Sequence, residues 1–107
     1  MSTAISPLAP KTYPDLPPIE GVTFATAEAG IKYKNRTDVL LLSLAEDTVV
    51  AGVFTRSKCP SAAVDWCREK LGRGRARGLL VNSGNANAFT GRKGIETVRI
   101  SADHAAK

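Results

Sequence analysis

Val39-Leu40-Leu41-Leu42-Ser43-Leu44-Ala45 is the stretch that decides the fold of this 107-residue chain. Ser43 is its one polar residue. Consecutive residues of a β-strand point to opposite faces of the sheet, so a strand that is apolar throughout needs cover on both faces. The stretch therefore predicts a strand inside a layered α/β structure, and not one on its surface.

The flanking segments predict further strands. Val22–Ala25 and Ala29–Tyr33 are short strand candidates before the apolar stretch. After it, Glu46-Asp47 forms a tight turn, and Thr48–Thr55 is expected to return as the second strand of an antiparallel hairpin. Gly52 inside this return strand indicates a bulge or a close backbone approach.

The second half of the chain predicts two helices and one more strand. Ser61–Val64 is a candidate edge strand, and Asp65 can cap a short helix that ends at Gly72. Leu79–Val81 is the next strand candidate. The last segment is predicted to be a helix because its apolar residues recur at helical spacing: Ile95, Val98, Ala102, Ala105 and Ala106.

Residues 1–18 differ from the rest in composition. Five of the six prolines lie there, which predicts an extended or disordered arm. With 43% hydrophobic and 23% charged residues the chain as a whole is typical of a globular domain. It shows no apolar signal-peptide core and no run long enough to cross a bilayer, so we expect a cytoplasmic protein with no membrane partner, in which Cys59 and Cys67 are reduced thiols.

An asparagine-rich loop is the candidate functional element. Between the strand at Leu79–Val81 and the final helix, residues 82–94 hold three Asn and three Gly and no acidic residue. A strand, a Gly-rich loop and a helix start present backbone N–H groups to an anion. The spacing of a nucleotide-binding P-loop is absent, and a single His with two distant Cys predicts no metal site, so no cofactor or metal is expected.

Thr90 and Gly91 admit two interpretations. The Thr90 hydroxyl and the Gly91 N–H are adjacent donors at the start of a helix, an arrangement that suits a developing oxyanion. Alternatively, Thr90 is the helix N-cap and Gly91 is present for its backbone dihedrals. Spacing alone does not choose between them.

The basic segment Gly72–Gly78 raises a second hypothesis. With a formal net charge of +5, the chain could be a small nucleic-acid-binding module that contacts phosphates through Arg73, Arg75 and Arg77. No aromatic residue lies between the arginines to stack on bases, so a solvated turn between helix and strand is the alternative.

A resemblance to a known family joins these segments. From about Ile19 to the last residue the chain resembles the N-terminal part of the ornithine acetyltransferases, the bifunctional glutamate N-acetyltransferases of arginine biosynthesis. The motifs that carry the resemblance occur in the same order: Gly21-Val22-Thr23, Ala29-Gly30-Ile31-Lys32, Ala51-Gly52-Val53-Phe54-Thr55, Ala62-Ala63-Val64 and, most specific, Asn82–Gly91.

The resemblance implies a fold, a reaction and partners. The fold is an α/β/β/α layered sandwich, and the reaction moves an acetyl group from N-acetylornithine, and in many members from acetyl-CoA, to glutamate. The precursor cuts itself before a threonine that becomes the nucleophile, and its α and β chains form a heterotetramer with two of each. Thr90 and Gly91 match the oxyanion-hole pair of this family, and nucleic acid is not among the implied partners.

Two departures qualify the resemblance. Phe89 stands where the family places a small residue, often Cys, so it is expected to reshape the wall beside the oxyanion hole. No cleavage motif or nucleophilic threonine of the family can be matched to this sequence. Residues 19–107 are therefore expected to be an incomplete domain, inactive and unstable by itself.

Overall fold

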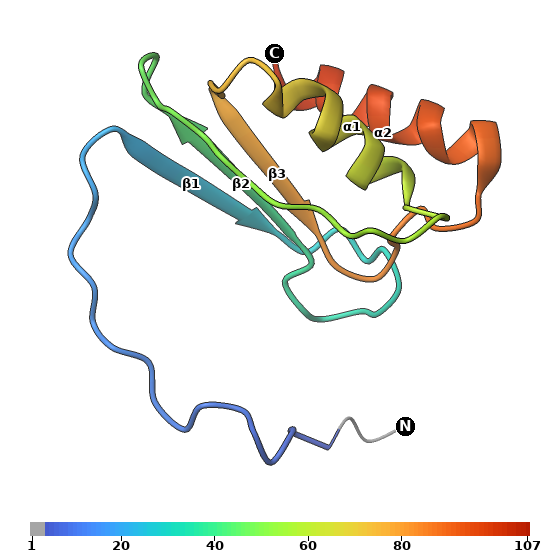
Figure 1. The fold of residues 1–107 in the computed structure, drawn as a ribbon. Coiled ribbons are helices and arrows are strands. Elements are labelled where there is room, and N and C mark those ends of the chain that lie inside the picture. Colours follow the sequence, from blue (N-terminus) through green and yellow to red (C-terminus); the bar gives the residue numbers. More distant parts are fainter. Residues whose placement is uncertain (1–3) are drawn as a thin grey trace.

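A computed structural model describes residues 4–107, which form an antiparallel sheet with two helices packed on one side (Figure 1). The elements in chain order are β1 (Val22–Ala27), β2 (Val39–Leu44), α1 (Ala62–Leu71), β3 (Gly78–Asn82) and α2 (Gly91–Ala105). The sheet order is β1-β2-β3, so the apolar stretch at residues 39–45 forms the central strand. The predicted strands at Val22 and Leu79 and the predicted final helix are confirmed.

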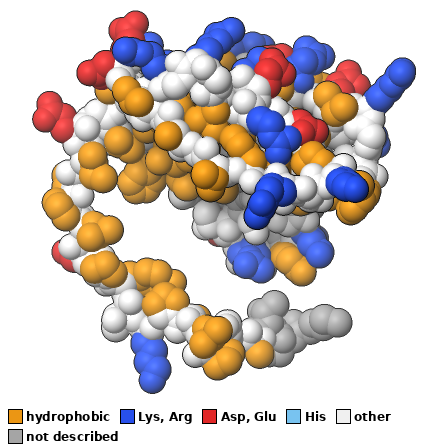
Figure 2. Space-filling model, in the orientation of Figure 1, with side chains coloured by type: hydrophobic (Ala, Val, Ile, Leu, Met, Phe, Trp, Pro, Cys, Tyr) orange, Lys and Arg blue, Asp and Glu red, His pale blue; other side chains and the backbone are white. Residues whose placement is uncertain are grey.

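The two faces of the sheet have different neighbours. On one face Ala25, Leu41 and Leu80 lie in register, and together with residues of α2 they line a shallow groove. On the other face Phe24 lies opposite Leu42, which lies opposite Leu79. Figure 2 shows hydrophobic side chains gathered over the side of the molecule where β1 and β2 lie.

The second face has no cover within the described residues. Phe24 is 73% exposed and Leu79 is 48% exposed, and no hydrophobic side chain of residues 4–107 is buried. These residues thus supply one helix layer and one sheet layer of an α/β fold. The remaining layers of the predicted α/β/β/α sandwich stay a prediction.

The predicted hairpin between residues 39–45 and Thr48–Thr55 is wrong. Both edges of β2 are hydrogen-bonded already, to β1 and to β3, and this leaves no edge for a returning strand. Thr48–Thr55 instead has no regular secondary structure apart from an isolated bridge between Val49 and Arg75. Gly52 therefore lies in no strand and forms no bulge; its neighbour is a side chain, since a Cβ there would lie 3.3 Å from Leu71 Cδ1.

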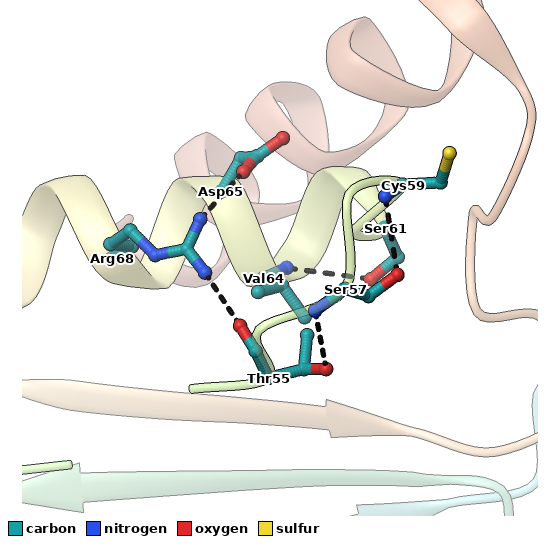
Figure 3. Close-up of polar contacts among 7 residues, drawn as sticks. All are labelled: Thr55, Ser57, Cys59, Ser61, Val64, Asp65 and Arg68. Atoms are coloured by element: carbon teal, nitrogen blue, oxygen red, sulfur yellow. Dashed lines mark hydrogen bonds and ion pairs between the residues drawn. The ribbon is translucent and has the colours of Figure 1, made fainter. Parts of the chain in front are cut away.

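The predicted edge strand at Ser61–Val64 is also wrong. These residues form the N-cap and first turn of α1, where the Ser61 hydroxyl accepts the Val64 N–H at 3.4 Å (Figure 3). Asp65, predicted to be the cap, lies within the helix and pairs with Arg68 at 3.3 Å. Arg68 also donates to the Thr55 carbonyl at 3.1 Å and so ties the irregular segment to α1. The helix ends at Leu71, before Gly72, as predicted.

The described residues before β1 are almost all exposed. Residues 4–19 contain no helix or strand and extend away from the sheet (Figure 1). Within residues 4–107, no helix has the length and hydrophobicity that a membrane span requires.

Candidate functional site

The asparagine-rich segment of residues 82–94 joins β3 to α2 as predicted, and its loop consists of residues 83–90, because Asn82 ends β3 and Gly91 begins α2. From here on, the asparagine-rich loop means residues 83–90. Its backbone needs the left-handed region repeatedly, with φ of 110° at Gly84, 49° at Asn87, 57° at Phe89 and 57° at Gly91. Gly and Asn tolerate these dihedrals, whereas an aromatic residue adopts them only at a cost in conformational energy. Phe89 is therefore held in a strained conformation, and its side chain is exposed.

Asparagine side chains hold this loop together from within. The Asn82 amide donates to the Asn85 carbonyl at 2.8 Å, and the Asn85 side-chain oxygen accepts the Asn87 N–H at 3.0 Å. The Asn87 carbonyl accepts the Ala62 N–H at 3.4 Å, which connects the loop to the start of α1. The asparagines therefore shape the backbone of the loop that leads to Thr90 and Gly91.

Thr90 and Gly91 lie next to each other where the loop enters α2. Thr90 is at the N-cap position, but its hydroxyl does not cap the helix; it donates to the Asn87 carbonyl at 3.0 Å. The side-chain cap considered from the sequence is thus absent. The positive φ of Gly91 confirms that glycine is needed there for its dihedrals, and its N–H has no protein acceptor within residues 4–107.

Gly94 fixes the place of the Thr90 side chain. It is the only residue of α2 classed as buried, and a Cβ at Gly94 would lie 2.9 Å from Thr90 Cβ and would collide with Thr90 Oγ1. The Gly94 N–H also donates to the Thr90 carbonyl at 3.4 Å. Sequence reasoning did not single out Gly94, although a glycine inside a helical pattern is itself an indication of a packing requirement.

Asp38 is a second residue of the candidate site that the sequence pattern did not indicate. The residue is only 6% exposed, and its carboxylate accepts the Ala29 N–H at 2.6 Å and the Ile31 N–H at 2.8 Å. The backbone N–H groups of Ile31 and then Ala29 lower the pKa of Asp38 below its usual value, against the opposing effect of burial. These bonds explain why Ala29–Tyr33 is a loop and not the predicted strand.

Asp38 also contacts the asparagine-rich loop. Its carbonyl accepts the Ser83 N–H at 2.9 Å. Beside this bond Gly84 packs on Lys32, since a Cβ at Gly84 would lie 2.9 Å from Lys32 Cβ. An Asp immediately before a strand and after a polar turn was the available indication, because short acidic side chains often accept nearby backbone N–H groups.

The arginine segment lies away from this loop. Arg75 forms the bridge with Val49, and Arg77 pairs with Glu46 at 3.8 Å. The segment precedes β3 and the asparagine-rich loop follows it, so the five residues of the strand separate them by about 17 Å. The arginine segment and the asparagine-rich loop therefore do not form one surface.

Metal-binding groups are not brought together in the part of the chain that the structure describes. No three His, Cys, Asp or Glu side chains of residues 4–107 are placed to hold a metal ion. Cys59 and Cys67 are free and exposed.

Comparison with known proteins places most of the chain in one family. Residues 23–107 match the ArgJ family. A Mesorhizobium japonicum protein named arginine biosynthesis bifunctional protein ArgJ is 66% identical over 107 residues, which are 100% of this chain and 26% of that protein. A Bradyrhizobium diazoefficiens protein of the same name is 65% identical, again over 100% of this chain and 26% of its own length. The chain thus spans about a quarter of these curated relatives.

Similar solved structures come from proteins of the same kind. The ornithine acetyltransferase of Mycobacterium tuberculosis, complexed with ornithine, is 38% identical with a TM-score of 0.74, over 78% of this chain and 44% of that one. The arginine biosynthesis bifunctional protein ArgJ of Bacillus halodurans is 27% identical with a TM-score of 0.70, over 76% and 42%. Nothing in these comparisons supports a nucleic-acid-binding role for Arg73, Arg75 and Arg77.

Proposed function

The chain belongs to the ArgJ family, and on that basis we propose that it is the N-terminal part of an acetyltransferase of arginine biosynthesis. The enzyme transfers an acetyl group from N2-acetylornithine to glutamate, and use of acetyl-CoA as a further donor is left open. Residues 19–107 contribute the oxyanion hole, and residues 4–18 form an arm outside it; the first three residues of the predicted arm lie outside the described part of the chain.

The pairing of Thr90 with Gly91 is the observation that carries this proposal. An acyl transfer develops negative charge on the carbonyl oxygen, and donors already in place lower the barrier. The Gly91 N–H has no protein acceptor within residues 4–107. The Thr90 hydroxyl donates its one proton to Asn87 at 3.0 Å, and rotation about its C–O bond turns that proton to a substrate without moving the oxygen.

The charge around this pair favours an anion. The N-terminus of a helix carries a partial positive charge, and the first turn of the 15-residue α2 contains no acidic residue. Arg92 and Lys93 follow Gly91 directly and are exposed. An oxyanion beside Gly91 would thus be stabilised by the helix and by two nearby cations.

The remaining parts of the site belong to other segments of the enzyme. In this proposal a self-cleaved threonine outside the chain is the nucleophile, so acetyl transfer proceeds in two steps through an acyl-enzyme. The partners of the chain are the rest of the precursor, in a cytoplasmic heterotetramer of two α and two β chains. The open sheet face around Phe24 and Leu79 is consistent with such a partner.

Replacement of Thr90 by Val in the full-length enzyme tests the oxyanion role. Loss of one oxyanion donor lowers kcat by about 10²- to 10³-fold, and that is the expected result for acetyl transfer from N2-acetylornithine. Thr97→Val is the matched control, because the Thr97 hydroxyl also donates to a backbone carbonyl, that of Lys93 at 2.8 Å, but lies further along α2. It should leave kcat unchanged.

Two measurements accompany kcat. Thermal unfolding of Thr90→Val should match that of Thr97→Val, since each loses one exposed hydrogen bond. Wild-type kcat in the Thr90→Val enzyme, or equal losses in both variants, would contradict the oxyanion role.

A further inference from the structure

Asp38 connects two loops at one end of the sheet. Because the sheet is antiparallel, β1 ends, β2 begins and β3 ends at the same end of the sheet, where Ala27, Val39 and Asn82 lie in register. The loop of residues 28–37 and the asparagine-rich loop both start from this end of the sheet. Asp38 stands between them and is nearly inaccessible to water, at 6% exposed.

Each part of Asp38 holds a different loop. The carboxylate accepts the N–H groups of Ala29 and Ile31, and the carbonyl accepts the Ser83 N–H at 2.9 Å. Hydrogen bonds to a charged acceptor are about twice as strong as neutral ones, and a buried donor left without its acceptor is destabilising. The first of the two loops therefore has a fixed shape as long as Asp38 is ionised.

The shape of the first loop determines where the asparagine-rich loop can lie. Gly84 is packed on Lys32, whose Cβ would be 2.9 Å from any Cβ at position 84. A side chain at position 84 would therefore not fit without displacing Lys32, so the two loops approach closely at this point. If residues 29–31 are released, Lys32 moves and the support beneath Gly84 is lost.

A series of hydrogen bonds connects the residues around Gly84 to Thr90. Asn82 bonds Asn85, Asn85 bonds Asn87, and the Asn87 carbonyl accepts the Thr90 hydroxyl. Together with the bond from the Ser83 N–H to the Asp38 carbonyl, they form a sequence of contacts from Asp38 to Thr90.

We propose that Asp38 is a positioning residue of the acetyl-transfer reaction: by holding residues 29–31 against the asparagine-rich loop, it sets the place of the Thr90 and Gly91 donors. This inference rests on the proposed function, because it needs Thr90 and Gly91 to contact the reacting carbonyl. Asp38 itself does not touch substrate.

Asp38→Asn in the full-length enzyme is the main test. The amide keeps one acceptor oxygen but presents an NH₂ to the second backbone N–H, so one of the two short bonds is replaced by two opposed donors. A displacement of about 1 Å at a catalytic group costs about 10²-fold in rate, and we expect kcat to fall by about 10- to 100-fold with KM for N2-acetylornithine nearly unchanged. Asp47→Asn, the same change at an exposed carboxylate, should leave both constants unchanged.

A double-mutant cycle separates positioning from general destabilisation. If Asp38 acts through Thr90, Asp38→Asn should lower kcat far less in the Thr90→Val enzyme than in the wild type. Equal fold-losses in the two backgrounds would overturn the inference, as would wild-type kcat in Asp38→Asn.

Amide hydrogen exchange gives a readout that does not depend on activity. Exchange in residues 83–87 should accelerate in Asp38→Asn and stay as in the wild type in Thr90→Val. Protection of residues 83–87 unchanged by Asp38→Asn would overturn the inference even if Thr90 proves essential. Wild-type turnover in Thr90→Val would instead refute the proposed function, so the two failures are distinguishable.

Gly84→Ala is the second variant, in case Asp38→Asn does not fold. It keeps the Asp38 bonds but forces Gly84 and Lys32 apart, at a backbone φ of 110° that alanine rarely adopts. The expected result is again a fall in kcat with little change in KM. Wild-type kcat in Gly84→Ala would contradict the proposed route from Asp38 to Thr90.

Discussion

Substitution of Gly94 by Ala sets two opposing effects against each other. Ala is a better helix former than Gly by about 1 kcal/mol, so inside α2 the change should stabilise the protein if nothing else intervened. The new methyl group, however, would collide with the Thr90 hydroxyl oxygen and lie 2.9 Å from Thr90 Cβ. Overpacking of this kind costs about 1–3 kcal/mol, so the balance should fall between neutral and about 2 kcal/mol destabilising.

The same collision should affect catalysis. The clash is relieved if the Thr90 side chain rotates, which breaks its 3.0 Å hydrogen bond to Asn87, or if the start of α2 shifts. Either movement displaces the hydroxyl from its place beside the Gly91 N–H. We expect kcat to fall by about 10²-fold, close to the loss on removing one oxyanion donor.

Urea unfolding and steady-state kinetics on the full-length enzyme measure both effects. Gly72→Ala is the matched control, because Gly72 has helical dihedrals (φ −57°, ψ −20°) and the nearest atom to an added Cβ is 3.5 Å away. It should be neutral or stabilising by up to about 1 kcal/mol, with kcat unchanged. If Gly94→Ala also gains stability and keeps its kcat, the contact between Gly94 and Thr90 does not position the donor.

Two further predictions concern stability. The 107-residue chain expressed alone should aggregate or unfold without cooperativity, because none of its hydrophobic residues from 4 to 107 is buried; a monomeric peak in size exclusion with a cooperative thermal transition would contradict this. The second concerns pH. The pKa of Asp38 is lowered on folding, so its stabilising effect is complete above the unfolded-state pKa near 3.8 and is lost as pH falls through the lower folded-state pKa. Urea midpoints of the full-length enzyme should therefore fall in this acidic range more steeply for wild type than for Asp38→Asn, and parallel curves would contradict it.

Hydrophobic runs predict the three strands of the sheet, because apolar strand residues leave a direct trace in sequence, whereas three further candidates, Ala29–Tyr33, Thr48–Thr55 and Ser61–Val64, form no strand. Val39–Leu44 was recognised as the strand that needs cover on both faces, and it is the central strand. The strand at Leu79 and the helix after Thr90 were predicted for the same reason.

Pairing and capping were harder to predict. Thr48–Thr55 has the composition of a strand, but which strand occupies the edge of β2 depends on β3, more than 20 residues further along the chain. Ser61 and Asp65 are both good N-cap residues, and only the structure shows that the Ser61 hydroxyl accepts the Val64 N–H. Local propensity does not decide between such competing partners.

The sequence predicts the two hydrogen-bond donors of the candidate site, but not the residues that hold them in place. Thr90 and Gly91 were found because a polar loop at a helix start is visible in sequence, and the family resemblance gave them a role that stays a prediction. Asp38 and Gly94 were missed, because their importance comes from contacts with Ile31 and Thr90. A buried carboxylate and a glycine packed under a side chain look unremarkable in a one-dimensional pattern.

An apolar central strand also raises the question of what fixes its register. In most sheets a slip by one residue moves hydrophobic side chains into water, and that penalty specifies the pairing. β2 has leucines on both faces, at 40, 42 and 44 and at 41, so the penalty for a slip is small. The register is set instead by a contact that is specific to one residue: the Asp38 carboxylate accepts the Ala29 and Ile31 N–H groups just beyond β1, and a slip of β2 would break both bonds. Asp38, which shapes the loops at one end of the sheet, therefore also fixes the position of β2 against β1.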